Sequence, residues 1–495
     1  MKSTALALLF SVVSLAQSQK ITPQKVIDDY VRATGGAKAL AQIQTETIAG
    51  SLSEESTGKT GSYSLIVKAP NRFYSELIVE PNRDVDAYNG KSAWGQDFSE
   101  GTHTLTGDAA KEAEAAGRYR NGRLADLKKD KLIVQLAGIE KVRGRDAYHI
   151  HAVLGAGVTR ELFFDTKTHL MVRETVATEQ FDYDDYRLVH RIQTPYQIEL
   201  HRGGHDYRVS VTRAEFNSPV DNSVFDFPKA AGIPLPDMKA LFLDLSKNQK
   251  ALEEMRRLYT WHATVEAQET DSKGQIKPKT VLELEVFPIA GGGAVGHLIA
   301  KDSQPLTGNE KKKEDERFNK RFEEQSRKQA KKQAELASDP KKQAKHDEKQ
   351  EADITDFLRF KSFTNPRRER FRGQEVLAFD FGANPDNKAK SIEDRLVQNL
   401  AGVMLIDEQA HEVVRLEAHM ADVFKVAGGL VGSVDRGSGY VFEQTKINNE
   451  VWLPSYVEIH AAMRLLVVKE KLNQIVRFSD YKKFNAESKV VAVEQ

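Results

Sequence analysis

The sequence contains several histidines close enough together to suggest a metal site. The pairs lie two, four and eight residues apart: His149 and His151, His201 and His205, and His411 and His419. None of these pairs belongs to an HExxH motif or a comparable zinc-binding spacing. We therefore interpret the histidines as structural or surface side chains and expect no metal.

A second candidate for chemistry is the acidic run FDYDDYR, in which Asp182 and Asp184 fall on one face of an expected strand. Two carboxylates so placed could hold calcium. Strands also carry acidic residues that pair with Arg or Lys on a neighbouring strand. We favour this second interpretation and predict a solvated strand with such partners.

Nucleophile and phosphate-binding motifs are absent from the sequence. There is no cysteine, no GxSxG or SxxK motif and no P-loop. The glycine runs at Gly291 to Gly293 and at Gly428 and Gly429 lack the context of a phosphate-binding loop and are typical of turns. We expect a non-enzymatic protein without a cofactor; a hydrolase acting on envelope material is an alternative with no motif to support it.

The charge balance of the sequence does not indicate a class of binding partner. Lys and Arg together number 72, as do Asp and Glu, so the formal net charge is zero. Such a chain lacks the overall basic field that is typical of nucleic-acid binding, and we expect no nucleic-acid partner. The absence of cysteine also excludes disulfides.

The first residues are typical of a secretory signal peptide. Lys2 precedes a short apolar run from Ala5 to Val13, and small residues at Ala16 and Ser18 suit cleavage near residue 18. No other segment approaches the ~18 apolar residues of a membrane-spanning helix. We predict a signal peptide over residues 1–18 and an exported, periplasmic protein that is not integral to the membrane.

Two stretches more than two hundred residues apart share one arrangement. Each has an Arg-Gly turn, a strand that ends in Asp, a strand with Val-Arg and a later strand that begins near Pro. The residues are Arg143, Gly144, Asp165, Val172, Arg173 and Pro195 in the first copy, and Arg372, Gly373, Asp407, Val414, Arg415 and Pro454 in the second. A repeat this long indicates duplicated domains. We predict a first domain over 19–233, a linker over 234–248, a second domain over 249–485 and a tail over 486–495.

Local patterns indicate the elements of the first copy. Pro23 to Ala33 has helical spacing and is followed by Gly35 and Gly36. Gly61 to Lys68 and Phe73 to Val79 alternate like strands, and Asn89 with Gly90 is a hairpin signal. The segment between Gly107 and Leu136 is helical in pattern.

A charged insert interrupts the second copy at residues 309–351. It consists almost entirely of Lys, Arg, Glu, Gln and Ala, and Phe318, Phe322 and Leu336 are too few to cover a core-facing stripe. We expect a solvated, mobile helical hairpin; a basic arm that binds a partner is the alternative.

Between Ser64 and Asp97 a strand ends in Val67 and Lys68, a corner at Pro70 and Asn71 starts the next strand, and a hairpin at Asn89, Gly90 and Lys91 leads to Trp94. This stretch resembles the hallmark region of periplasmic lipoprotein carriers, the LolA/LolB-like family. The closing segment DNSVFDFPKAAGI is also similar to the end of that domain, and Trp452 to Phe484 is similar to the closing strands of relatives in the lipoprotein-sorting group. The matching hallmark residues are Val67, Lys68, Pro70, Asn71, Phe73, Pro81, Asn89, Gly90, Lys91 and Trp94.

The resemblance implies a β-dominated α+β fold with two tandem unclosed antiparallel β-barrels, each packed with helices. It also implies an apolar groove that shelters the acyl chains of lipid or lipoprotein. The carriers have an Arg where this chain has Ala69. Their lid mechanism therefore cannot be transferred to this protein.

We predict groove residues from the best alternating strand faces, although any of them could instead fill a core. They are Tyr63, Leu65, Val67, Phe73, Leu77 and Trp94 in the first domain, and Leu377, Phe379, Trp452 and Tyr456 in the second. The alternative function is an envelope scaffold with solidly packed domains that binds a protein partner through the charged hairpin or open sheet edges.

Overall fold

The computed structural model describes most of the chain. The described residues are 21–97, 99–128, 132–154, 157–228, 236–270, 277–339, 360–389, 391–429, 431–465 and 468–483. Contacts within the chain define two compact units: unit 1 is residues 1–81 with 115–220, and unit 2 is residues 82–114 with 221–495. The predicted signal peptide lies outside the described residues.

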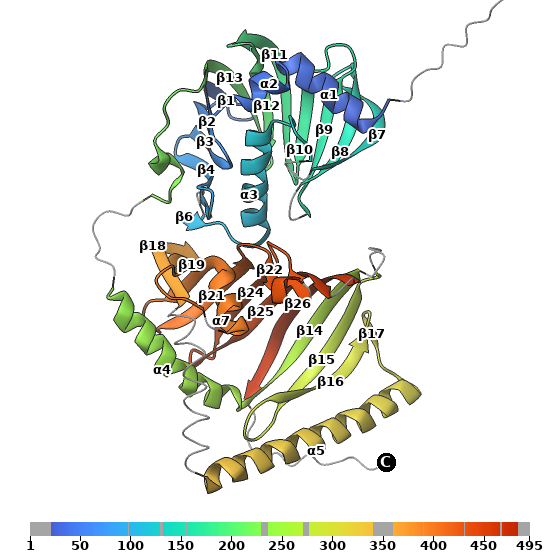
Figure 1. Cartoon of the computed structure of the whole chain (residues 1–495), viewed down its shortest axis with the longest axis vertical. Helices are drawn as coiled ribbons and strands as arrows, with labels where there is room; N and C mark the ends of the chain where they lie inside the picture. The colour runs from blue at the N-terminus through green and yellow to red at the C-terminus, as the bar shows by residue number, and fades with distance from the viewer. Residues whose placement is uncertain are drawn as a thin grey trace, which may run out of the picture. The chain divides into compact units, whose positions relative to one another are not determined.

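The predicted β-dominated α+β fold with two unclosed antiparallel sheets is confirmed (Figure 1). The strand order of the first sheet is β6-β5-β4-β3-β2-β1-β13-β12-β11-β10-β9-β8-β7. Its strands are β1 Thr45–Glu54, β2 Thr60–Lys68, β3 Arg72–Val79, β4 Asn82–Tyr88, β5 Ala93–Asp97, β6 Gly101–Thr104, β7 Ile133–Val142, β8 Arg145–Val153, β9 Thr159–Asp165, β10 Met171–Val176, β11 Glu179–Val189, β12 Ile192–Arg202 and β13 His205–Phe216.

The second sheet has the order β17-β16-β15-β14-β26-β25-β24-β21-β20-β19-β18, and β22 and β23 pair beside β25. Its strands are β14 Tyr259–Thr270, β15 Thr280–Pro288, β16 Ala294–Lys301, β17 Gln304–Pro305, β18 Lys361–Phe371, β19 Gln374–Ala383, β20 Leu400–Asp407, β21 Glu412–Met420, β22 Phe424–Val426, β23 Gly432–Val434, β24 Gly439–Ile447, β25 Val451–Leu465 and β26 Val468–Lys483.

The helices that the structure describes are α1 Pro23–Thr34, α2 Ala37–Ala41, α3 Gly107–Gly122, α4 Met238–Arg256, α5 Gly308–Ser338 and α7 Ile392–Asn399, with short 3-10 turns η2 Asn222–Phe225 and η3 Ala427–Gly429. The segment with a helical pattern between Gly107 and Leu136 is helix only as far as Gly122. α4 begins at Met238, inside the segment that we interpreted as a linker.

Both sheets place the first strand beside the last. β1 pairs with β13 in the first sheet, and β14 pairs with β26 in the second, all antiparallel. The first sheet takes its strands from residues 45–216 and the second from residues 259–483. The repeat seen in the sequence is therefore a repeat of topology, while the predicted domain boundaries, which differ from those of the contact units, stay a prediction.

The repeated Arg-Gly pairs form equivalent hairpin turns. Arg143 and Gly144 have φ of 48° and 79°, and Arg372 and Gly373 have φ of 49° and 80°. Two successive residues with positive φ match the right-handed twist of a two-residue hairpin. The first turn joins β7 to β8 and the second joins β18 to β19, so the two copies share this local geometry.

Helix α1 begins and ends as the sequence predicts. The Thr22 hydroxyl accepts a hydrogen bond from the Lys25 amide at 3.2 Å, Pro23 opens the helix, and Gly35 ends it. The helix buries Val26 and Ile27 in the core of unit 1, beside residues of β8–β10.

Candidate functional site

The histidines on strand β8 contact glutamate side chains rather than one another. His149 contacts Glu140 and Glu161, each at 2.7 Å, and His151 contacts Glu161 at 2.6 Å. In the described part of the chain, no group of three or more His, Cys, Asp or Glu side chains could hold a metal ion. These histidines bind neighbouring carboxylates.

The acidic pair on β11 has arginine partners. Arg173, directly opposite on β10, donates to Asp182 at 2.5 and 2.7 Å, and Arg145 of β8 donates to Asp184 at 2.7 Å. The predicted cross-strand pairing is confirmed for Asp182. Asp182 is buried rather than solvated.

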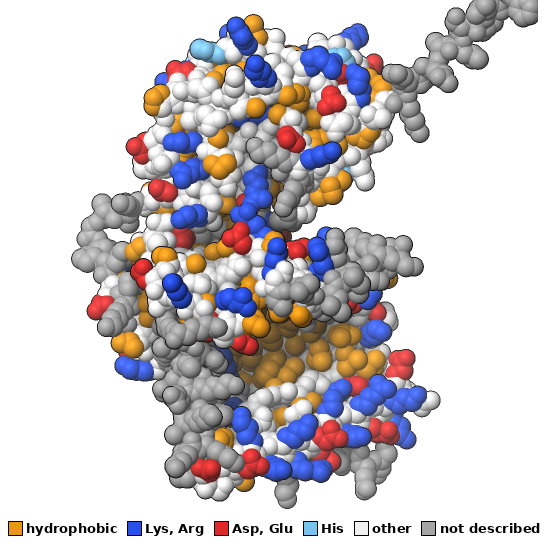
Figure 2. All heavy atoms as spheres, in the orientation of Figure 1, with side chains coloured by type: hydrophobic (Ala, Val, Ile, Leu, Met, Phe, Trp, Pro, Cys, Tyr) orange, Lys and Arg blue, Asp and Glu red, His pale blue; other side chains and the backbone are white. Residues whose placement is uncertain are grey.

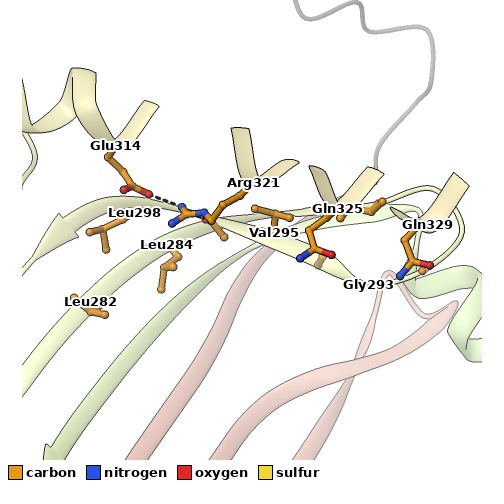
Figure 3. Close-up of a pocket in the computed structure, with 13 residues that line it drawn as sticks. Leu282, Leu284, Gly293, Val295, Leu298, Glu314, Arg321, Gln325 and Gln329 are labelled. Atoms are coloured by element: carbon orange, nitrogen blue, oxygen red, sulfur yellow. Dashed lines mark hydrogen bonds and ion pairs between the residues drawn. The ribbon is translucent and has the colours of Figure 1, made fainter. Parts of the chain in front are cut away.

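Unit 2 contains a cavity of about 590 Å³ between α5 and the strands β15 and β16. Its strand side is apolar and its helix side is polar (Figure 3). The strand side consists of Leu282, Leu284, Ile289, Val295 and Leu298, and the helix side consists of Glu314, Arg321, Gln325 and Gln329. Hydrophobic side chains gather in a hollow on this face of unit 2 (Figure 2).

The charged groups of this cavity neutralise each other. Arg321 donates to the Glu314 carboxylate at 2.6 Å and to the carbonyl of Gly296 at 3.1 Å. Both charged side chains come from α5, seven residues apart, so they lie along the helix and leave the strand side apolar. The cavity therefore suits an uncharged ligand whose apolar part lies against the strands and whose polar group lies at α5.

Helix α5 packs on the sheet through an aromatic cluster. The Phe318 ring lies 5.4 Å from the Phe287 ring and 4.7 Å from the His297 ring. The Nε2 atom of His297 lies within hydrogen-bond distance of the Asp315 carboxylate, at 2.8 Å. Gln333 donates to the Gly291 carbonyl at 3.2 Å. Most side chains of α5 are exposed, as expected of a solvated helix. One aromatic ring nevertheless packs the helix on the sheet, although its apolar stripe is narrow. The second arm of the expected hairpin lies outside the described residues.

Unit 1 contains a smaller cavity of about 160 Å³ inside its curved sheet. Apolar side chains from β1, β2 and β12 form one part of its wall, including Ile48, Leu65, Val67 and Ile198. The polar part of the lining includes five tyrosines and four charged residues. They are Tyr30, Tyr63, Tyr119, Tyr183, Tyr186, Glu46, Arg120, Arg123 and Glu174.

Burial keeps the tyrosines of this cavity protonated. It raises the pKa of Tyr30 to about 12, and it also raises the pKa of Tyr63 and of Tyr186. Burial is likewise the main cause that raises the pKa of Tyr119 and Tyr183, with Glu174 adding to it. The hydroxyls are therefore neutral hydrogen-bonding groups, and the negative charge at the cavity belongs to carboxylates.

The structure places three of the predicted groove residues at a cavity. Tyr63, Leu65 and Val67 line the unit 1 cavity, whereas Phe73 and Leu77 are buried on β3 and do not line it. Contact of any of them with a ligand stays a prediction.

The other candidates lie apart from both cavities. The indole of Trp94 donates to the carbonyl of Phe225 at 2.9 Å. Leu377, Phe379 and Trp452 are buried in two hydrophobic clusters of unit 2, and the Tyr456 hydroxyl donates to Glu458 at 2.6 Å. None of these side chains lines the unit 2 cavity. Alternation along a strand indicates a buried face, but it does not distinguish a packed core from a cavity.

The sequence does not predict that residues of α5 line a cavity, and it does not predict the charged residues of the unit 1 cavity. The signal available for α5 was the run Glu314 to Gln329, in which Glu, Arg, Gln and Gln recur at helical spacing. For unit 1, Arg120 and Arg123 recur three residues apart after an Ala-rich helical stretch. Neither pattern by itself points to a cavity.

None of the helices among the described residues combines the length and the apolar character needed to cross a membrane. No protein-family model matches the sequence, and no curated protein matches it.

Several solved structures are similar to this chain. A DUF1329 family protein from Desulfovibrio piger is 15% identical, with a TM-score of 0.30, over 42% of this chain and 98% of that one. A LolA superfamily protein from Nitrosomonas europaea is 12% identical, with a TM-score of 0.29, over 42% and 98%. The MucA/MucB complex of Pseudomonas aeruginosa matches at 8% identity and a TM-score of 0.16, over 93% and 99%. Identities this low concern the fold alone.

Proposed function

We propose that this protein is a non-enzymatic carrier of the cell envelope that holds the acyl chains of lipid or lipoprotein in the cavity of unit 2. The observation that carries the proposal is the apolar strand wall under α5, formed by leucine and valine side chains of β15 and β16. Export to the periplasm, which the sequence predicts, would give such a carrier its place of action.

The size and chemistry of the cavity support an acyl chain. Its volume of about 590 Å³ falls within the range of small-molecule pockets. Burial of an alkyl chain is favourable by about 0.8 kcal/mol per methylene, so an apolar wall alone supplies affinity. Glu314 and Arg321 form a pair with no net charge. This pair and the side-chain amides of Gln325 and Gln329 can form hydrogen bonds with an ester or amide group of the ligand.

Mass spectrometry of the purified mature protein tests the proposal. We expect stoichiometric co-purifying lipid, and saturable binding of a fluorescent long-chain fatty-acid probe. Protein that carries no lipid and also fails to bind the probe would contradict a carrier and would favour the envelope scaffold.

A pair of matched substitutions localises the site. Leu284→Glu places a carboxylate in the apolar wall, and we expect probe affinity to fall at least about tenfold, because an unpaired charge is costly in an apolar site. Leu188→Glu makes the same change at a side chain that is 67% exposed on β11, and should leave probe binding unchanged. Equal affinities of the two variants would place the ligand elsewhere.

A further inference from the structure

The charged groups around the unit 1 cavity do not balance. Arg123 pairs with Glu46 at 2.7 Å, and Arg202, close by, pairs with Glu179 at 2.6 Å. Glu174 is left to face the guanidinium groups of both Arg160 and Arg120. The single negative charge of Glu174 therefore faces two positive charges.

The surplus positive charge lies on Arg120. Glu174 is already engaged, because it accepts hydrogen bonds from Arg160 and from the Tyr183 hydroxyl, the latter at 3.0 Å. The Nε of Arg120 is buried and has no hydrogen-bond partner among the described residues. Arginine presents five N–H donors, and a buried donor without an acceptor destabilises its site.

Arg120 stays charged in this setting. Burial opposes the charge and the Glu174 carboxylate favours it, and the pKa of Arg120 lies above its ordinary value. The hydroxyls of the cavity cannot supply a compensating negative charge because they remain protonated. The described residues therefore supply no acceptor for the Nε of Arg120.

The rest of the cavity accepts a short apolar group. Leu65, Val67 and Ile198 form an apolar wall, and the volume is about 160 Å³. An apolar cavity of roughly 150 Å³ holds a group of about six carbons, as the benzene-binding cavity engineered in T4 lysozyme illustrates. A guanidinium binds a carboxylate through two parallel hydrogen bonds.

We infer that the unit 1 cavity is a second binding site, for an organic carboxylate whose charged group contacts Arg120 and whose short apolar part lies against Leu65, Val67 and Ile198. This inference goes beyond the proposed function, because it concerns a different cavity and a charged ligand. It stands even if the unit 2 cavity binds no acyl chain.

Calorimetric titration of the full mature chain with hexanoate, hexanol and acetate tests the site. We expect hexanoate to bind at least about tenfold more tightly than hexanol, because the alcohol lacks the negative charge and the second acceptor oxygen of the carboxylate. Acetate should bind more weakly than hexanoate, because it lacks the apolar part. Equal affinities of hexanoate and hexanol would overturn the role of Arg120, and equal affinities of acetate and hexanoate would overturn the role of the apolar wall.

Three variants assign the effect to Arg120. Arg120→Met should abolish the preference for hexanoate over hexanol, and Arg120→Lys should keep part of it, because the charge remains and the two-pronged geometry does not. Arg118→Met, two residues earlier on α3 and not in the cavity lining, is the matched control.

Circular dichroism establishes whether each variant is folded. If a variant is not folded, the affinities of the wild-type protein for hexanoate, hexanol and acetate still test the inference. The long-chain probe should bind the unit 2 cavity of Arg120→Met as it does in the wild type. A hexanoate preference that survives in Arg120→Met, or that disappears equally in Arg118→Met, would overturn the inference.

Discussion

Arg160 on β9 and Glu174 on β10 form an ion pair in the interior of unit 1, where their side chains are 1% and 3% exposed. The guanidinium of Arg160 also lies over the ring of Tyr119, 4.7 Å from its centroid. The pair therefore joins two neighbouring strands to helix α3. Glu174 also lines the cavity, where it accepts a hydrogen bond from Tyr183 and faces Arg120.

Breaking this pair should destabilise unit 1 strongly. In Glu174→Gln, two guanidinium groups lose their carboxylate, and we expect the free energy of unfolding to fall by about 3–5 kcal/mol. Urea unfolding followed by circular dichroism measures the change. Lys141→Met breaks an exposed pair with Asp146, whose side chains are 71% and 54% exposed, and should cost less than about 1 kcal/mol. A similar loss in both variants would contradict the structural role of Glu174.

Glu412 should make the stability of unit 2 depend on pH. Burial raises the pKa of this carboxyl from its ordinary value of 4.5 to about 7, with Arg256 opposing the change and Asp407 adding to it. The folded state holds the proton more tightly than the unfolded state, so the stabilisation is complete below the unfolded pKa. It is lost as the pH rises through about 7.

The measurement is the free energy of unfolding between pH 5 and pH 8, compared with Glu412→Gln. We expect the wild type to lose on the order of 2 kcal/mol more than the variant over this range, because the glutamine does not ionise. Identical slopes for the two proteins would show that Glu412 does not titrate in this way.

Gly402 on β20 allows two strands to approach closely. A Cβ at this position would lie 1.8 Å from the carbonyl oxygen of Glu417 on β21, so the strands would have to move apart. We expect Gly402→Ala to lower the free energy of unfolding by about 1–3 kcal/mol. Gly382 on β19 has no atom within 4 Å of such a Cβ, and Gly382→Ala should change stability by less than about 0.5 kcal/mol. Thermal or urea unfolding of both variants measures these changes. Equal losses would indicate a general effect of replacing glycine in a strand rather than the close approach of β20 and β21.

Local chemistry explains which elements could be predicted from the sequence. The end of the first helix at Gly35, the turn at Asn89 and the Arg-Gly turns at Arg143 and Arg372 depend on residues a few positions apart, and each forms as expected. In the same way, Asp165 and Asp407 accept hydrogen bonds from amides two and three residues later. The repeat could be recognised because these short-range signals recur in both copies.

The cavities could not be predicted, because they depend on distant pairings. Glu46 and Arg123 lie 77 residues apart, and whether Arg120 has a partner depends on which strands carry Arg160 and Glu174. Buried clusters such as the one around Leu377 and Phe379 have the same alternating pattern as a cavity wall. The pattern identifies the inward face of a strand, whereas the space in front of that face is set by the tertiary structure.

The packing of α5 on the sheet should control access to the unit 2 cavity. Phe318 joins the helix to Phe287 and His297, so we expect Phe318→Ala to loosen the helix. A loss of about 1.4 kcal/mol of docking would raise the undocked population tenfold, and limited trypsin cleavage within the Lys- and Arg-rich α5 should accelerate to the same degree. The long-chain probe should also dissociate faster, because the helix forms one wall of its site. Glu316→Ala changes an exposed residue of the same helix and should leave both rates unchanged; if Phe318→Ala behaves like this control, the aromatic cluster does not hold the helix on the sheet.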